Sequence, residues 1–199
     1  MSLPVLALTM GDPAGIGPEI TAKALACESL YSECLPFVIG DFTLMKQQER
    51  YLEGRTFSKI ASPDELPSLP PSACGVLQPG PDLQGVRPGE LSAEAGKAAA
   101  SYVKSAISLG REKAIQGIVT APLNKAALHL GGENYPGHTE RLVEGFSVSR
   151  YAMVLAAEDR YGFLVSKYQS LQDAIFSFTV DNVYHCNHQA YLLSLASRL

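Results

Sequence analysis

Two short polar segments carry the side chains that are best suited to chemistry. Segment 120–125 reads TAPLNK and follows an apolar run, and segment 135–140 reads YPGHTE and is rich in turn formers. In α/β proteins, binding and catalytic residues gather in loops that follow buried strands. Lys125 supplies a positive charge, His138 a titratable ring and Thr139 a hydroxyl group. Together these three groups could hold a phosphorylated polar substrate, and we expect His138 and Thr139 to line a cleft with residues 120–125.

Each of these side chains also has a purely structural interpretation. His138 could be a surface-loop histidine, or it could cap a helix whose first turn holds Glu140, and Lys125 could be an ordinary exposed lysine. His185 and His188 could meet on one helix face. No third ligand of the right type lies near them in the sequence, and a usable metal site needs at least three protein ligands. We therefore expect a surface pair of histidines there and no metal site.

A third segment, MGDPAGIGPE at 10–19, is a glycine-rich turn between an apolar run and an expected helix. Its spacing is G-x3-G-x-G, so it is neither the dinucleotide fingerprint nor a P-loop. The turn could bring backbone N–H groups and a helix N-terminus close to an anion or cofactor. It could equally be a structural turn in which glycine takes a positive φ. The residues leave both interpretations open, and both predict that 11–17 joins the first strand to the first helix.

The spacing of apolar residues predicts strands that alternate with helices. We expect strands at 4–9, 36–40, 75–77, 115–119, 151–156 and 162–165, and helices at 20–30, 42–52, 92–109, 122–131 and 180–199. Ala95, Ala99, Val103 and Ala106 share one apolar face of the helix at 92–109. Gly110 is expected to stop this helix, and Thr179 is expected to cap the last helix. This alternation indicates an α/β fold with a largely parallel sheet.

Composition and charge narrow the class of protein. A hydrophobic content of 46% with 18% charged residues supplies a packed core. The net charge of −4 and the lack of a basic run argue against a nucleic-acid partner. No apolar stretch is long enough to span a bilayer, and no signal peptide is recognisable. The four cysteines lack C-x-x-C spacing and suit a reducing compartment. We therefore expect a cytoplasmic protein with no membrane partner.

Three motifs carry a resemblance to a known family. LTMGDPAGIGPEI at 8–20, VTAPLNKAAL at 119–128 and YPGHTE at 135–140 occur in the order and at the intervals of the PdxA family, 4-hydroxythreonine-4-phosphate dehydrogenase. The resemblance implies homodimers of three-layer α/β/α subunits, similar to isocitrate and isopropylmalate dehydrogenases. It also implies a first α/β domain at 1–121, without its C-terminal segment, and part of a second domain at 122–199. On this basis we expect the chain to be truncated at its C-terminus.

The resemblance also implies an activity. The family oxidises the secondary alcohol of 4-phosphooxy-L-threonine with NAD or NADP and then decarboxylates it, within pyridoxal 5′-phosphate biosynthesis. His138 and Thr139 match the family's substrate-binding residues, and we group Lys125 with them. The motifs identify no catalytic or cofactor-binding residue. Two alternatives stay open: a dehydrogenase of a 4-phosphorylated sugar acid such as threonate or erythronate phosphate, and a degenerate, non-catalytic homologue that binds a phosphorylated ligand.

The divalent metal of the family, which is zinc, magnesium or cobalt, is not expected to bind this chain. Three histidines hold it in the family, where it polarises substrate oxygens. Tyr168 stands in the place of the first histidine, and tyrosine is a poor ligand for such an ion. The other two histidines belong to the family's C-terminal part, beyond Leu199. The resemblance therefore assigns no metal ligand to this chain.

Overall fold

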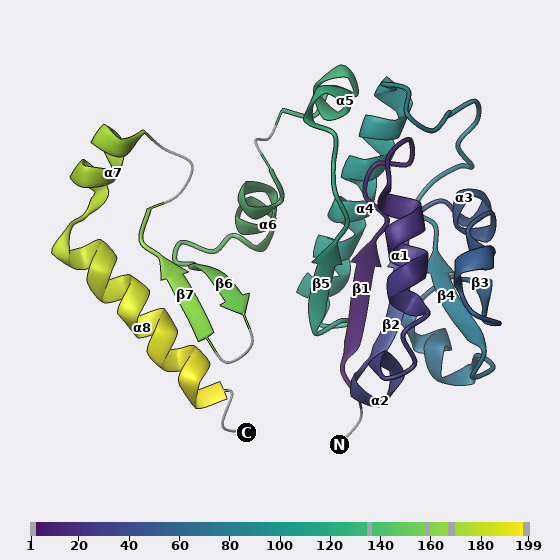
Figure 1. Cartoon of the computed structure of the whole chain (residues 1–199), viewed down its shortest axis with the longest axis horizontal. Coiled ribbons are helices and arrows are strands. Elements are labelled where there is room, and N and C mark those ends of the chain that lie inside the picture. The colour runs from purple at the N-terminus through teal and green to yellow at the C-terminus, as the bar shows by residue number, and fades with distance from the viewer. Residues whose placement is uncertain (1–2, 135–136, 158–159, 167–169, 197–199) are drawn as a thin grey trace. The chain divides into compact units, whose positions relative to one another are not determined.

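The computed structural model describes residues 3–134, 137–157, 160–166 and 170–196, which form two compact units (Figure 1). The first unit is Met1–Phe146 and the second is Ser147–Leu199. This division falls later than the domain boundary predicted after residue 121, because two helices of 122–146 contact the long helix of the first unit. The assignment of domains at 1–121 and 122–199 stays a prediction.

A parallel five-stranded sheet forms the centre of the first unit. Its strands in chain order are β1 Val5–Thr9, β2 Leu35–Ile39, β3 Thr56–Ile60, β4 Ala73–Leu77 and β5 Gly117–Thr120. Their order in the sheet is β3-β4-β2-β1-β5, and every neighbouring pair is parallel. The strand order reverses beside β1, because β2 lies on one side of it and β5 on the other. The parallel sheet confirms the predicted α/β fold.

Helices cover both faces of this sheet, with α1 in front of it and α4 behind it in Figure 1. The α-helices of the first unit are α1 Gly17–Leu25, α2 Leu30–Glu33, α3 Phe42–Lys46, α4 Ala93–Arg111, α5 Lys125–Leu130 and α6 His138–Phe146. Two 3-10 helices are η1 Glu49–Tyr51 and η2 Pro63–Ser68. The arrangement confirms a three-layer α/β/α architecture.

The core lies between the sheet and these helices. Phe37, Val38 and Ile39 of β2 are completely buried, as expected for a central parallel strand that is covered on both faces. The apolar face predicted for α4 is also buried, and its members are Ala95, Ala99, Val103 and Ala106. The helical periodicity of small apolar residues therefore identified correctly the side of α4 that faces the core.

The end of α4 differs from the prediction that Gly110 stops it. The helix continues past Gly110, and Lys113 takes the left-handed conformation with a φ of 60°. The Lys113 N–H donates to the Gly110 carbonyl at 3.1 Å and the Ala114 N–H donates to the Leu109 carbonyl at 2.9 Å. These bonds form a Schellman motif with lysine in the position usually held by glycine. Gly110 instead gives room to Phe146, whose Cζ would lie 2.7 Å from a Cβ at that position.

Other boundaries also shift from the predicted ones. The helix expected at 20–30 ends at Leu25 and is followed by the separate helix α2, and the helix expected at 42–52 divides into α3 and η1. Strand β3 was not predicted, because it is an edge strand whose sequence, TFSKI, has few apolar residues. Only Phe57 and Ile60 of this strand are buried, so its apolar signal is weak.

The second unit contains a β-hairpin and two helices. Strands β6 Met153–Ala157 and β7 Arg160–Leu164 pair antiparallel, and the helices are α7 Leu171–Ser177 and α8 Val180–Ala196. The paired strands were predicted, and α8 begins as predicted, with Thr179 Oγ1 accepting a hydrogen bond from the Asn182 N–H at 3.2 Å. Tyr168 lies outside the described residues. Among the helices of the described ranges, none has the length and apolar character needed to cross a membrane.

Candidate functional site

The loops that follow β1 and β5 meet where the strand order reverses. Ligands of open α/β sheets bind outside the carboxyl ends of the strands at such a reversal. The Asp12 N–H donates to the Pro122 carbonyl at 2.9 Å, and the Ala121 N–H donates to the Thr9 carbonyl at 3.1 Å. The bond of Asp12 joins the glycine-rich turn to segment 120–125, and the bond of Ala121 joins that segment to the end of β1.

Gly11 permits this close approach of the two loops. Its φ is +73°, and a Cβ at this position would lie 2.5 Å from the carbonyl oxygen of Pro122. A larger residue would strain the backbone and push the loops apart. The close contact between the loops therefore explains why position 11 requires glycine. Residues 11–16 lie outside any helix and α1 begins at Gly17, which confirms that this turn joins β1 to α1.

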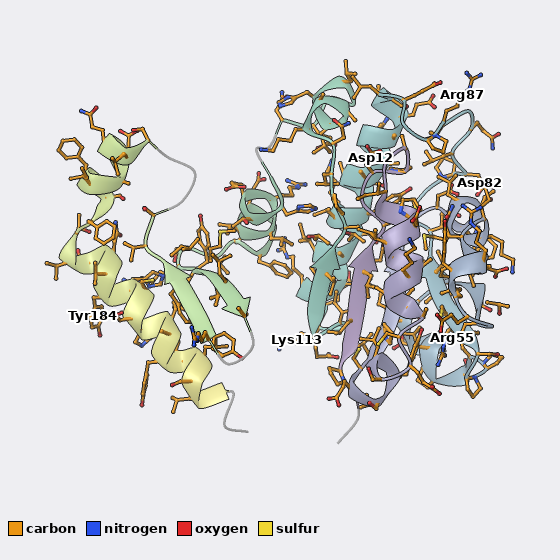
Figure 2. All side chains as sticks on the ribbon, in the orientation of Figure 1. Asp12, Arg55, Asp82, Arg87, Lys113 and Tyr184 are labelled. Carbon is orange, nitrogen blue, oxygen red and sulfur yellow. The ribbon has the colours of Figure 1, made fainter. Side chains whose placement is uncertain are left out.

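A pocket of about 380 Å³ opens between these two loops, and we call it the switch-point pocket. Its lining residues are Asp12, Gly15, Ile16, Pro122, Leu123, Asn124 and Lys125. Its volume falls within the range of small-molecule sites. Figure 2 marks Asp12 at the end of β1 from which the turn departs. The polar side chains of the pocket are one carboxylate, one amide and one ammonium group.

Local hydrogen bonds hold two of these side chains. Asp12 is only 7% exposed, and its Oδ1 accepts from the Ala14 N–H at 2.9 Å. Asn124 is the N-cap of α5, where its Oδ1 accepts from the Ala127 N–H at 3.2 Å. Lys125 is the first residue of α5 and is exposed. Sequence reasoning did not single out Asp12, whose only signal was an acidic residue in a strand-to-helix turn.

Helix α5, which carries Lys125, is anchored on α4. Leu128 is 1% exposed and packs with Ala100 of α4. A Cβ at Gly96 of α4 would collide with the carbonyl oxygen of Ala127, so glycine is required for the two helices to approach this closely. Packing against α4 therefore determines the position of Lys125 at the rim of the pocket.

His138 and Thr139 are not among the residues that line the switch-point pocket. Both are half-buried in the first turn of α6, which also holds Glu140. The His138 Nε2 is buried and has no hydrogen-bond partner in the described part of the chain. Burial lowers the pKa of His138, which favours the neutral ring. Neither residue shares the switch-point pocket with Lys125, and their role in substrate binding stays a prediction.

The described residues include no group of three or more His, Cys, Asp or Glu side chains that could hold a metal ion. The two histidines of α8 have separate neighbours. His185 Nε2 lies 3.3 Å from the carbonyl oxygen of Tyr151, and the His188 ring stacks on Tyr184 with 6.3 Å between the ring centroids. The described residues therefore do not fit the family's three-histidine metal site. The substitution at Tyr168 lies outside them, so the lack of a metal ligand stays a prediction.

Comparisons with known proteins agree on one family. The family model described as "Pyridoxal phosphate biosynthetic protein PdxA" matches residues 32–192. A D-threonate 4-phosphate dehydrogenase of Bordetella bronchiseptica is 46% identical over 87% of this chain and 50% of its own length. A 4-hydroxythreonine-4-phosphate dehydrogenase of Desulfosudis oleivorans is 35% identical over 90% of this chain and 53% of its own length. The chain spans about half the length of the curated relatives it matches.

A solved structure supports the same conclusion for the fold. The 4-hydroxythreonine-4-phosphate dehydrogenase of Burkholderia phymatum matches with a TM-score of 0.85 and 34% identity. The match covers 96% of this chain and 58% of that one. The family is also the one that the motifs at 8–20, 119–128 and 135–140 resemble. The chain belongs to the PdxA family.

Proposed function

We propose that this chain forms part of an NAD(P)-dependent dehydrogenase that oxidises the secondary alcohol of a 4-phosphorylated hydroxy acid. The observation that carries the proposal is the switch-point pocket, which places a carboxylate, an amide and an ammonium group where α/β folds bind their ligands. Membership of the PdxA family supplies the reaction class, because relatives carry names of dehydrogenases that act on phosphorylated acids.

D-threonate 4-phosphate is the substrate that we favour. The Bordetella bronchiseptica relative named for that compound is 46% identical to this chain, whereas the Desulfosudis oleivorans relative named for 4-hydroxythreonine 4-phosphate is 35% identical. The second candidate is therefore 4-phosphooxy-L-threonine, which the family resemblance implies. With that substrate the reaction would belong to pyridoxal 5′-phosphate biosynthesis.

The residues of this chain bind and orient the substrate in this proposal. Lys125 pairs with an anionic group, as an exposed ammonium at a pocket rim can do without losing its own hydration completely. His138, neutral because burial lowers its pKa, and Thr139 contact the substrate in the assembled site, as the resemblance implies. NAD or NADP accepts the hydride when it is bound. The described residues identify no site for this cofactor, and no step is derived through a metal ion.

The proposal also includes a homodimer that works in the cytoplasm. Exposed apolar side chains on α7 and α8 of the second unit support self-association, because large apolar surfaces commonly mark interfaces. Four free cysteines are compatible with a reducing compartment. Light scattering of the purified chain should give the mass of a dimer. A monomer at every concentration would contradict this part of the proposal.

One assay tests the proposed activity. The 199-residue chain is mixed with D-threonate 4-phosphate or 4-phosphooxy-L-threonine, with NAD or NADP, and with or without a divalent metal ion, and reduction of the nicotinamide is followed by absorbance. We expect reduction that is faster with D-threonate 4-phosphate. The Bordetella bronchiseptica relative serves as the positive control. Binding of both substrates without any reduction would favour a non-catalytic homologue.

A further inference from the structure

We propose that Asp12 is a specificity-determining residue whose carboxylate accepts a hydrogen bond from a hydroxyl group of the phosphorylated hydroxy acid that pairs with Lys125. The inference rests on the proposed function and deepens it. Lys125 pairs with a negative charge that any phosphorylated acid carries. Asp12 would recognise a hydroxyl group, which a simple phosphorylated acid lacks.

Asp12 is a buried carboxylate with spare acceptor capacity. It is 7% exposed, and Oδ1 accepts from the Ala14 N–H at 2.9 Å. In the described part of the chain, no hydrogen bond or ion pair reaches Oδ2. A carboxylate offers about four acceptor positions. Because Asp12 lines the pocket, its Oδ2 can accept from a hydrogen-bond donor on a bound ligand.

Lys125 reaches the same pocket from the opposite loop. Within the described ranges, it forms no ion pair with Asp12 or with any other carboxylate. Two opposite charges that line one pocket without pairing leave room for a ligand between them. Such a ligand needs a hydrogen-bond donor for the carboxylate and a negative charge for the ammonium group. A phosphorylated hydroxy acid carries both.

Hydrogen bonds hold the two loops that carry these charges. The hydrogen bond from the Asp12 N–H to the Pro122 carbonyl, 2.9 Å long, ties the two loops together. Asn124 is held as the N-cap of α5, and its Oδ1 is used there, so its amide Nδ2 is available to donate to the same ligand. A pocket whose polar groups are preorganised discriminates between ligands better than one that must rearrange.

The competing interpretation is that Asp12 only closes the turn through its bond to Ala14. The substitution Asp12→Asn separates the two roles. Asparagine keeps an amide oxygen that can accept from the Ala14 N–H, so the turn is retained. It removes the negative charge, and hydrogen bonds to charged groups are roughly twice as strong as bonds between neutral groups. A merely structural Asp12 would therefore tolerate this change without any loss of ligand preference.

Titration calorimetry of the full chain tests the inference with two ligands. One is D-threonate 4-phosphate, and the other is 4-phosphooxybutanoate, which has the same charged ends but no hydroxyl groups. We expect the wild-type chain to bind the hydroxylated ligand about 10-fold more tightly, the value of one hydrogen bond to a charged group. Asp12→Asn should remove most of this preference. Lys125→Gln should weaken binding of both ligands by a similar factor, because it removes the shared ionic contact.

Matched substitutions outside the pocket control for the loss of charge. Asp181→Asn on α8 and Lys59→Gln on β3 change the same kinds of side chain at exposed positions. Neither should alter the affinity for either ligand. Circular dichroism of every variant confirms that it is folded before binding is measured.

The possible results separate this inference from the proposed activity. Equal wild-type affinity for the two ligands, no binding of either one, or an unchanged preference in folded Asp12→Asn would overturn the role of Asp12. A chain that prefers the hydroxylated ligand through Asp12 but reduces no nicotinamide would support the inference and contradict the activity. A chain that reduces the nicotinamide but shows no ligand preference that depends on Asp12 would support the activity and contradict the inference.

Discussion

The two compact units of the chain bury their apolar residues to very different extents. In the first unit the sheet is covered on both faces, and its central residues, such as Phe37 and Val38, are completely buried. In the described part of the second unit, Cys186 is the sole buried hydrophobic residue. Large apolar side chains there that are more than half exposed are Leu155, Tyr161, Leu171, Ile175, Phe176, Phe178, Val180, Tyr184 and Tyr191.

The difference shows what each architecture can bury. A five-stranded sheet between helices offers two covered faces, whereas a two-stranded hairpin with two helices has too little surface to enclose its own apolar side chains. The packed core of the first unit therefore supports the two loops that line the switch-point pocket. The second unit leaves many apolar side chains exposed in the described structure, which supports the proposed homodimer.

A matched pair of phenylalanine substitutions should give the largest contrast. Phe37→Ala in β2 removes a completely buried ring and should lower the free energy of unfolding by about 3–5 kcal/mol. Phe176→Ala in α7 removes a ring that is 75% exposed and should change it by less than about 0.5 kcal/mol. Urea denaturation followed by circular dichroism measures both. A large loss with Phe176→Ala would show that α7 is covered in solution and would weaken the contrast between the units.

A pair of glycine substitutions should give the next largest difference. Gly96→Ala forces α5 away from α4, because the new Cβ collides with the Ala127 carbonyl, and should cost about 1–3 kcal/mol. Gly162→Ala in β7 places a Cβ 3.8 Å from the Leu155 carbonyl, an ordinary contact, and should change stability by less than about 0.5 kcal/mol. Thermal melting compares the two. Because α5 carries Lys125, Gly96→Ala should also weaken binding of D-threonate 4-phosphate, and unchanged binding would argue against the anchoring role of α4.

Two serine N-caps provide a smaller test of the same contrast. Ser92 Oγ accepts from the Ala95 N–H at the start of α4, and Ser170 Oγ accepts from the Asp173 N–H at the start of α7, each at 3.2 Å. Ser92→Ala should cost about 1 kcal/mol of unfolding free energy. Ser170→Ala should mainly speed amide hydrogen exchange within α7, because that helix lies outside the buried core. Equal effects on global unfolding would mean that both helices belong to one cooperative unit.

The smallest expected effect is a dependence of stability on pH through His138. Burial lowers the pKa of the folded state below its usual value of 6.5, so the unfolded chain binds more protons below that pH. The contribution of the neutral ring is fully present above pH 6.5 and is lost as the pH falls toward the folded pKa. The melting temperature of wild type should therefore fall more than that of His138→Gln on acidification. Parallel curves between about pH 8 and pH 5 would show that the ring does not titrate in this way.

The sequence determined most elements of secondary structure, because their signals are local. Apolar runs predicted β1, β2 and β5, and small apolar residues at helical spacing predicted the buried face of α4. Thr179 was recognised as a helix cap from its type and position alone. Local patterns did not predict the end of α4, since the left-handed residue is Lys113, a type that such positions seldom use.

The candidate site was predictable only in part. Lys125 and segment 120–125 were identified because polar residues follow an apolar strand. Asp12 was not singled out, because its importance depends on its burial and on its neighbours in the pocket. The local sequence of the glycine-rich turn shows neither of these. The switch-point pocket contains Lys125 but not His138, so the cleft expected to join His138 to segment 120–125 stays a prediction.

The tertiary structure alone decided which loops meet. The strand order β3-β4-β2-β1-β5 brings the glycine-rich turn against segment 120–125 and so creates the switch-point pocket. Hydrogen bonds that secure this order connect distant residues: the Val5 N–H donates to Gln116 Oε1 at 2.8 Å across 111 positions. Periodicity in a sequence reports which face of a segment is apolar, but many strand orders satisfy the same periodicity. Packing of the whole first unit selects one order, and the pocket follows from it.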